Sequence, residues 1–209
     1  MAAMRRHFLF LIALFASACA GLAPTPAQDG ETRTLQSYEQ WRATTSAPVG
    51  AFETALREQG LDGQVPMHEL LRTASDWSIC KASPYDVPPE AQWPAAFSVL
   101  RLLKTLREQG VLNRITVYSS YRNAELNACA QGAKGSAHLR AYAIDFRPID
   151  DEQAGRRLCA FWQTKGRELK MGLSRYPSGR IHIDTFGWRT WGADHTGATA
   201  FCAAPPKAD

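Results

Sequence analysis

Two short segments of the chain carry residue types that can bind a metal ion and activate water. One contains His138 and Asp145, and the other, further along the chain, contains His182 and Asp184. A catalytic zinc ion commonly takes three nitrogen or oxygen ligands and leaves a fourth position for water. Zinc lowers the pKa of that water to about 7, so hydroxide forms at neutral pH. The two imidazoles and two carboxylates therefore make one Zn²⁺ ion a candidate cofactor.

Both segments alternate in the way that half-buried β-strands do. Because successive side chains of a strand point to opposite faces, residues 142–146 place Asp145 on the face away from three large side chains. Residues 180–184 place His182 and Asp184 on the face away from two isoleucines. A carboxylate buried without a partner is costly, and a metal ion would be such a partner. The pattern alone equally allows polar residues on exposed strand faces, with Asp145 in a turn or capping position.

The first segment resembles a motif of the D-alanyl-D-alanine carboxypeptidase family of zinc metallopeptidases. The family motif reads Ser-x-His-x-x-Gly-x-Ala-x-Asp, and this chain has alanine, Ala141, where glycine is usual. The family shares its fold with lysostaphin-type endopeptidases and the hedgehog signalling domain. The positions that match the motif are Ser136, His138, Ala143 and Asp145.

Further motifs extend the likeness over about residues 95–191. Upstream, Ser-Ser-Tyr-Arg at residues 119–122 resembles the family's Ser-Gly-Tyr-Arg stretch. Downstream, a Tyr-Pro pair precedes His-x-Asp and Trp191 follows it, as in the cell-wall endopeptidase branch of the family. Several motifs in the same order are far more specific than any one of them alone.

The resemblance implies a zinc metallopeptidase with a defined set of site residues. It implies His138, Asp145 and His182 as the ligands of one zinc ion. It implies Arg122 as a catalytic cation that holds a substrate carbonyl or carboxylate and stabilises the oxyanion, a role that suits a planar, permanently charged guanidinium. A structural salt bridge is the alternative for this arginine. Ser136 completes the first motif and is a candidate substrate-binding residue.

The general base is less well defined by the sequence. Many relatives place an acidic residue or histidine two or three residues before the last zinc ligand, but this chain has Arg180 and Gly179 there. Asp184 is the first candidate for the catalytic base because it shares the face of His182. It is alternatively a metal ligand or a residue that orients one. Tyr121 is a second candidate substrate-binding residue.

The implied activity is hydrolysis of D-amino-acid-containing peptide bonds in peptidoglycan. The enzyme would be a D,D-carboxypeptidase or a cross-link endopeptidase, with peptidoglycan stem peptides as its partners. A non-catalytic, metal-containing cell-wall-binding lipoprotein is the alternative from a different functional class. The formal net charge of the 209-residue chain is only +4, and no dense basic run supports nucleic acid as a partner.

The N-terminus predicts an exported protein. Residues 1–18 combine two arginines, a short apolar run and small residues, which is the form of a secretory signal. The small residues directly before Cys19 resemble a lipobox, so we expect lipid attachment at Cys19 and a periplasmic, membrane-anchored lipoprotein. Ordinary cleavage nearby is the alternative. The four cysteines that follow favour two disulfides, with three possible pairings, and they are Cys80, Cys129, Cys159 and Cys202.

The remaining pattern predicts one α+β domain with a small, mainly antiparallel sheet and flanking helices. Residues 19–34 form a Pro- and Gly-rich tether, and residues 35–209 form the zinc peptidase domain. Within it, residues 35–94 are a mostly helical part, broken near Pro48 and at 60–66, and residues 95–202 are the catalytic core.

Individual elements of the catalytic core are also predicted. Apolar spacing predicts a helix at 95–109, and β-branched residues predict a strand at 115–118. A capping box formed by Asp150 and Gln153 is expected to open a second helix. We expect the strand at 180–185 to turn back at 186–187 into residues 188–191.

Overall fold

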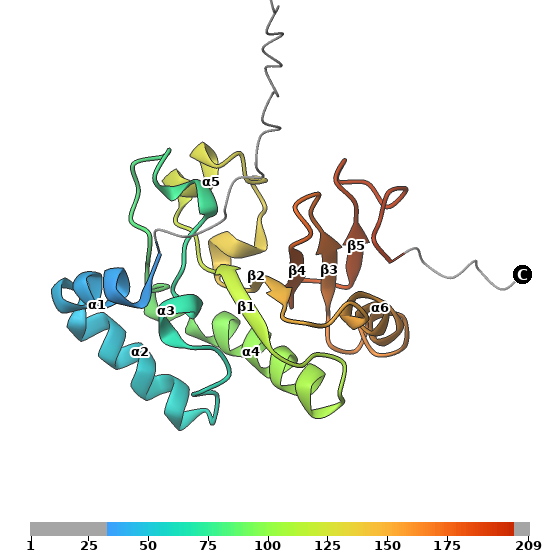
Figure 1. The fold of residues 1–209 in the computed structure, drawn as a ribbon, viewed down its shortest axis with the longest axis horizontal. Coiled ribbons are helices and arrows are strands. Elements are labelled where there is room, and N and C mark those ends of the chain that lie inside the picture. Colours follow the sequence, from blue (N-terminus) through green and yellow to red (C-terminus); the bar gives the residue numbers. More distant parts are fainter. Residues whose placement is uncertain (1–32, 203–209) are drawn as a thin grey trace, which may run out of the picture.

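The computed structural model describes residues 33–202 as an α+β fold with six α-helices and a five-stranded, mostly antiparallel sheet (Figure 1). This confirms the predicted fold class. The predicted signal, most of the tether and Cys19 lie outside the described residues. Among residues 33–202, no helix combines the length and the apolar character that crossing a membrane requires.

The N-terminal part is mostly helical, as predicted. Its helices are α1 (Leu35–Thr44), α2 (Ser46–Glu58) and α3 (Met67–Leu70). The first break falls at Thr45, three residues before Pro48. Pro48 lies in the first turn of α2, where a missing N–H leaves no helical hydrogen bond unmade.

Helix α4 (Trp93–Glu108) is the longest of the described helices. It begins two residues earlier than predicted, because Pro94 fits within the first turn. It ends before Gly110, whose φ of 67° favours glycine. Its apolar stripe is buried as expected, and Leu100, Leu103 and Leu106 are each 0% exposed.

The sheet has the strand order β1-β2-β4-β3-β5, and its neighbours are antiparallel except for the parallel pair β3 and β5. The chain turns back after β4 as expected, because β5 runs antiparallel to β4, but β5 does not pair with β4. Strand β4 is already paired on both edges, with β2 and with β3, so the chain passes β3 and adds β5 at the far edge. The bounds are β1 (Ile115–Ser119), β2 (Ala143–Pro148), β3 (Gly172–Arg175), β4 (Ile181–Asp184) and β5 (Arg189–Trp191).

Helix α6 (Ala154–Thr164) begins without the predicted capping box. Its N-cap is Gln153, which makes no side-chain cap hydrogen bond. Asp150 has a φ of 51° and lies in the turn after β2, too early in the chain to cap the helix. The remaining short elements are α5 (Ala124–Cys129) and the 3₁₀ turns η1 (Ser75–Trp77), η2 (Glu90–Gln92) and η3 (Ala137–Arg140).

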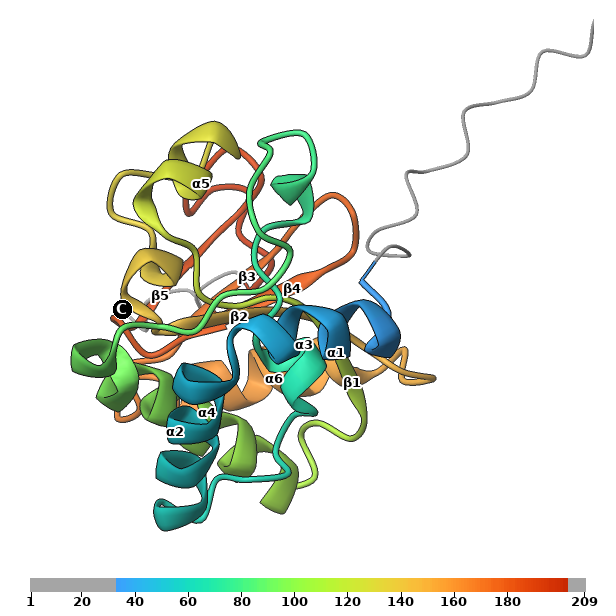
Figure 2. The ribbon, with the colours of Figure 1, turned by 90° about the vertical axis from the view of Figure 1, so that its left-hand side faces the viewer.

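The two faces of the sheet have different surroundings. Helices α4 and α6 lie on one side of it, and α5 with the loops around it lies on the other (Figure 2). On the helical side, apolar side chains fill the core, and Ile144, Phe146, Leu173 and Ile183 are 0% exposed. Each such side chain stabilises the fold by roughly 1.5–3 kcal/mol relative to leaving it in water. The opposite face is free to carry polar side chains.

Two disulfides join the four cysteines, as predicted, and the fold selects one of the three pairings. Cys80 pairs with Cys129 and Cys159 pairs with Cys202, with Cα–Cα distances of 5.9 and 5.2 Å. The first bond ties the loop after η1 to the end of α5. The second ties α6 to the segment after β5. Structural disulfides persist in oxidising compartments, which indicates an exported protein.

Candidate active site

Strand pairing brings the predicted ligands together on the polar face of the sheet. Asp145 of β2 lies directly opposite His182 of β4 in the antiparallel register. His138 comes from η3, the turn that leads into β2. All three side chains are buried, with exposures of 1% to 3%. Two motifs separated along the chain therefore meet at one place.

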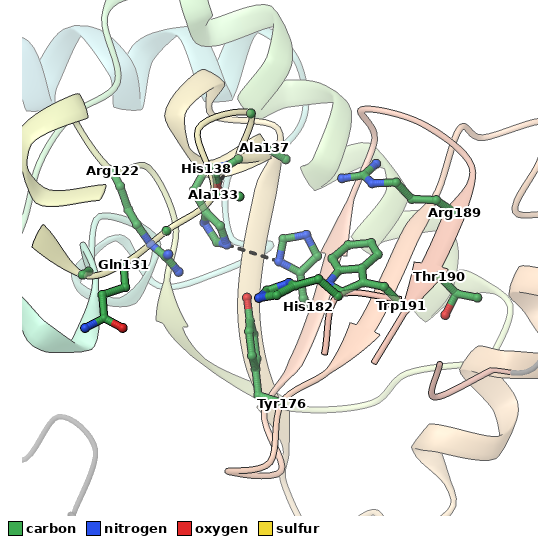
Figure 3. A pocket seen from close by; sticks show the side chains of 15 residues that line it. Arg122, Gln131, Ala133, Ala137, His138, Tyr176, His182, Arg189, Thr190 and Trp191 are labelled. Atoms are coloured by element: carbon green, nitrogen blue, oxygen red, sulfur yellow. Dashed lines mark hydrogen bonds between the residues drawn. The ribbon is translucent and has the colours of Figure 1, made fainter. Parts of the chain in front are cut away.

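Three ligand atoms of these residues converge on one another. His138 Nε2 lies 3.1 Å from Asp145 Oδ1 and 3.2 Å from His182 Nδ1, and the latter lies 2.9 Å from the same Asp145 oxygen. Figure 3 shows the two imidazoles facing each other beside the cleft. Ligands about 2.0–2.1 Å from a tetrahedral zinc ion lie about 3.4 Å apart. The triangle is thus close to the size that zinc requires.

The outer nitrogen of each imidazole fixes where the proton resides. His138 Nδ1 donates to the carbonyl oxygen of Ser120 at 2.6 Å. His182 Nε2 donates to Asp184 Oδ2 at 2.9 Å. Since a carbonyl and a carboxylate only accept, both neutral rings turn a lone pair inward, toward Asp145. Three lone pairs facing one point require a cation there, either a metal ion or a proton.

The pKa values of the metal-free site reflect this requirement. Burial, helped by the charge of Arg122, lowers the pKa of His138 to about 4. Burial also disfavours charge on His182, but hydrogen bonds with Asp145 and Asp184 outweigh it and raise the pKa to about 8. Burial likewise opposes charge on Asp145, but the two imidazoles hold its pKa well below its usual range. The metal-free site thus retains a proton on His182 at neutral pH.

Asp184 lies on the far side of the His182 ring from the converging atoms. Its two oxygens accept paired hydrogen bonds from Arg189 at 2.9 and 2.8 Å, and Oδ1 also accepts from the Phe186 backbone N–H. Gly172 on β3 lies opposite, and a Cβ there would come within 2.2 Å of Asp184 Oδ2. The carboxylate is 0% exposed and fits only because this neighbour is glycine.

Arg122 contacts Asp145, one of the predicted metal ligands, and also lines the cleft. Its guanidinium donates to Asp145 Oδ2 at 2.7 Å and to Ser119 Oγ at 3.0 Å. Its backbone N–H donates to the His138 carbonyl at 3.2 Å, which joins the two upstream motifs. Asp145 thus directs one oxygen at the imidazoles and the other at Arg122.

The alanine in the first motif adopts a conformation that glycine favours. Ala141 has a φ of 57° and ends η3 in the left-handed region. A side chain in this region is strained by roughly 1–2 kcal/mol. The turn is what carries the chain from His138 into β2, which explains physically why glycine is usual at this motif position.

A cleft of about 520 Å³ opens beside the three ligand atoms (Figure 3). Ser136 lines it and also caps η3, accepting from the His138 N–H at 3.3 Å. Within residues 33–202, the lining of this cleft does not include Tyr121, which packs partly buried against the hydrophobic core. His195 rims the cleft in an exposed loop.

Two cleft residues, Tyr176 and Arg189, were not assigned to the site from the sequence. Tyr176 directs its hydroxyl toward the site, as Figure 3 shows, and hydrogen-bonds Asp145. Burial and the charge of Asp145 raise its pKa, so the hydroxyl keeps its proton. Arg189 contacts Asp184 from β5, and the sequence does not show that β5 pairs with β3. The Tyr-Pro pair ahead of His182 was the one available signal for Tyr176.

Fold and site together define an α+β protein with a buried His-Asp-His cluster suited to a metal ion. The family model described as Peptidase M15 matches residues 65–184. This match spans more than half of the chain, so the protein belongs to the peptidase M15 family, the D-Ala-D-Ala carboxypeptidase family of zinc metallopeptidases. Searches of the curated proteins and of the solved structures gave no match.

Proposed function

We propose that this protein is a zinc peptidase that hydrolyses D-amino-acid-containing peptide bonds of bacterial peptidoglycan. The observation that carries the proposal is the convergence of three possible ligand atoms, from His138, Asp145 and His182, beside an open cleft. Family membership supports the reaction class. The two disulfides support action outside the cytoplasm.

The donor set fits zinc. Two neutral imidazoles and one carboxylate form a common catalytic zinc site with a remaining open position. The second hydrogen bonds of the two rings, to the Ser120 carbonyl and to Asp184, are the outer contacts that orient zinc-binding histidines. When bound, zinc supplies Lewis-acid polarisation of a carbonyl and acidifies a water molecule.

The protein's own residues have distinct parts in the proposed reaction. Arg122 stabilises negative charge that develops on the carbonyl oxygen, since its guanidinium lies beside Asp145 and lines the cleft. Tyr176, which stays protonated, donates a hydrogen bond to the same developing charge. Ser136 shapes the cleft wall next to His138.

We propose a positioning part for Asp184 rather than that of base or ligand. Both its oxygens are taken by Arg189, Phe186 and His182, and it lies on the side of the ring away from the ligand atoms. It fixes the proton on His182 Nε2 and so keeps Nδ1 available for the metal. A base acting on water would need to face the cleft.

The proposal extends to location and partners. Stem peptides of peptidoglycan are the proposed substrates, in a carboxypeptidase or a cross-link endopeptidase reaction. Lipid attachment at Cys19 would hold the enzyme at a membrane in the periplasm, with residues 19–34 as a tether.

Zinc content and turnover on purified sacculi test the proposal together. We expect one zinc per chain and soluble peptide products identifiable by mass, both lost on His138→Ala. His68→Ala is the matched control, because His68 lies on α3 beside Glu69 and outside the site. Zinc binding with no product from any peptide would contradict the enzyme.

A wall-binding module is the second candidate. Among the described residues lining the 520 Å³ cleft, none is aspartate or glutamate, so a carboxylate base is missing there. Sacculus binding without products would favour this module over the peptidase.

A further inference from the structure

A second, smaller cavity of about 150 Å³ lies next to the predicted metal ligands. It shares Arg122, Ala130 and Tyr176 with the large cleft, so the two hollows adjoin across these side chains. The small cavity is lined mainly by polar and charged groups. Its lining comprises Ala74, Ser75, Asp76, Arg122, Ala130, Asp145, Tyr176 and Arg180.

Arg180 brings a second guanidinium to this cavity. It lies directly before β4, two positions ahead of His182, and it lines the cavity together with Asp145 and Arg122. Its Nη1 donates to Ser75 Oγ at 2.5 Å and its Nε to Ser178 Oγ at 3.3 Å. The Tyr118 ring lies 5.9 Å away on another side. These contacts hold the guanidinium in place.

The wall opposite Arg180 is also fixed. Ser75 belongs to η1, and the loop that follows is bonded through Cys80 to Cys129. Ala130, the residue after Cys129, lines both hollows. The disulfide therefore joins two walls of the cavity, which keeps its polar groups near one geometry, as a preorganised binding site requires.

Charge determines what this cavity can hold. Two guanidinium groups, of Arg122 and Arg180, face two carboxylates, of Asp145 and Asp76. Asp145 is a predicted ligand, so a divalent ion would offset its charge, and Asp76 is exposed to water. With the metal in place, the described residues that line the cavity carry more positive than negative charge, and planar forks of N–H donors suit a carboxylate.

We infer that Arg180 and Arg122, with the hydroxyl of Ser75, form a binding subsite for a free carboxylate of the substrate. The substrate class is a peptide that carries this carboxylate on a residue next to the scissile bond. The inference rests on the proposed peptidase function and makes Arg180 a residue that determines specificity. Two carboxylates have the required chemistry, the α-carboxylate at a peptide's C-terminus and one on a side chain.

Matched peptides distinguish these two sources. D-Ala-terminated peptides are prepared with the terminal carboxylate free or amidated, and cross-linked peptides with the side-chain carboxylate free or amidated. We expect one amidation, and not the other, to weaken binding to the zinc-loaded protein about 10- to 100-fold, as expected for a lost charge-assisted contact. Titration calorimetry at low temperature measures this binding, and steady-state kinetics measure KM where turnover occurs.

Variants then assign the preference to Arg180. Arg180→Gln should remove the preference for the free carboxylate while zinc content stays at one per chain, and Arg180→Lys should restore part of it. Should the arginine variants fail to fold, Ser75→Ala provides a second test. We expect it to weaken binding of the free-carboxylate peptide several-fold. Arg175→Gln is the matched control, since Arg175 is exposed on β3 and lies over Phe201.

The outcomes separate this inference from the proposed function. If the protein binds carboxylate peptides through Arg180 but cleaves none, the inference stands and the peptidase function fails. If it cleaves peptides but the free and amidated forms bind equally well, or if Arg180→Gln keeps the preference, the inference is overturned and the peptidase function stands.

Discussion

His182 Nε2 donates to Asp184 Oδ2 across 2.9 Å, on the side of the imidazole opposite the atoms that face Asp145. The contact fixes the tautomer of a predicted metal ligand from within the same strand. Arg189 in turn holds the carboxylate with two hydrogen bonds. The zinc affinity of the site should therefore depend on residues that do not touch the metal.

Asp184→Asn tests this dependence. The amide keeps the size of the carboxylate but loses its charge, so His182 Nε2 is held less firmly. We expect zinc affinity to fall about 10- to 100-fold, the usual effect of losing such an outer contact, as measured by competition with a chelator. Asp194→Asn is the control, since Asp194 is an exposed loop acid bound to Thr196 and Thr199. Unchanged affinity in Asp184→Asn would argue against a positioning part for Asp184.

Gly172→Ala should disturb the same carboxylate from the neighbouring strand. The added Cβ would lie 2.2 Å from Asp184 Oδ2 and 2.6 Å from its Cγ, so the carboxylate has to move. We expect weaker zinc binding together with a lower free energy of unfolding in urea. Gly50→Ala is the control, because a Cβ there has nothing within 4 Å and alanine favours the helix. A Gly172→Ala protein with normal zinc affinity would show that Asp184 is not held as described.

The pH dependence of zinc binding follows from the pKa of His182, which is raised to about 8 in the metal-free protein. A pKa above the ordinary 6.5 means that the proton stabilises the metal-free fold below pH 6.5, and this contribution disappears as pH rises through 8. Zinc displaces that proton, so its apparent affinity should fall about tenfold per unit below pH 8. His138 has a pKa of about 4, so it should not add to this pH dependence of zinc affinity near neutrality.

Calorimetry in buffers of different ionisation enthalpy measures the proton release directly. We expect close to one proton per zinc from His182 at pH 7, and less as the pH passes 8; a zinc-bound water with a pKa of about 7 would release its own proton in addition. No release at pH 7 would contradict the described pairing of His182 with the two carboxylates.

Tyr176→Phe should affect the chemical step more than substrate binding. The hydroxyl points into the site, and removing one donor to a developing oxyanion commonly slows the reaction about 100-fold or more. We expect kcat to fall by about that factor with zinc retained. Tyr142→Phe is the matched control, since Tyr142 lines a different cavity beside α4. A raised KM with unchanged kcat would instead assign Tyr176 to binding alone.

The two disulfides should contribute similarly to stability but differently to activity. Their sequence separations are 49 and 43 residues, so loop-closure entropy gives each about 4 kcal/mol. Replacing both cysteines of either pair by alanine should lower the free energy of unfolding by about 2–5 kcal/mol in urea titrations. Only the Cys80–Cys129 replacement should also raise KM, because that bond joins two walls of the small cavity that Arg180 lines. Equal KM effects would contradict this difference.

The local pattern of the sequence was enough to predict several elements and the polar face of the sheet. Alternation in 180–184 placed His182 and Asp184 on one face, because the pleat of a strand imposes a period of two. The stripe of leucines predicted α4, because burial of one helix face follows the helical period. The order of the motifs also predicted the family to which the chain belongs.

Only the tertiary structure decided relationships between distant segments. The sequence does not show that β4 is paired on both edges, and that pairing sends β5 past β3 and brings Arg189 to Asp184. The cavity beside Arg180 likewise depends on a disulfide pairing that spacing cannot select. Side-chain period is a local property of the backbone, whereas strand order, disulfide pairing and the direction of a carboxylate depend on which distant surfaces pack together.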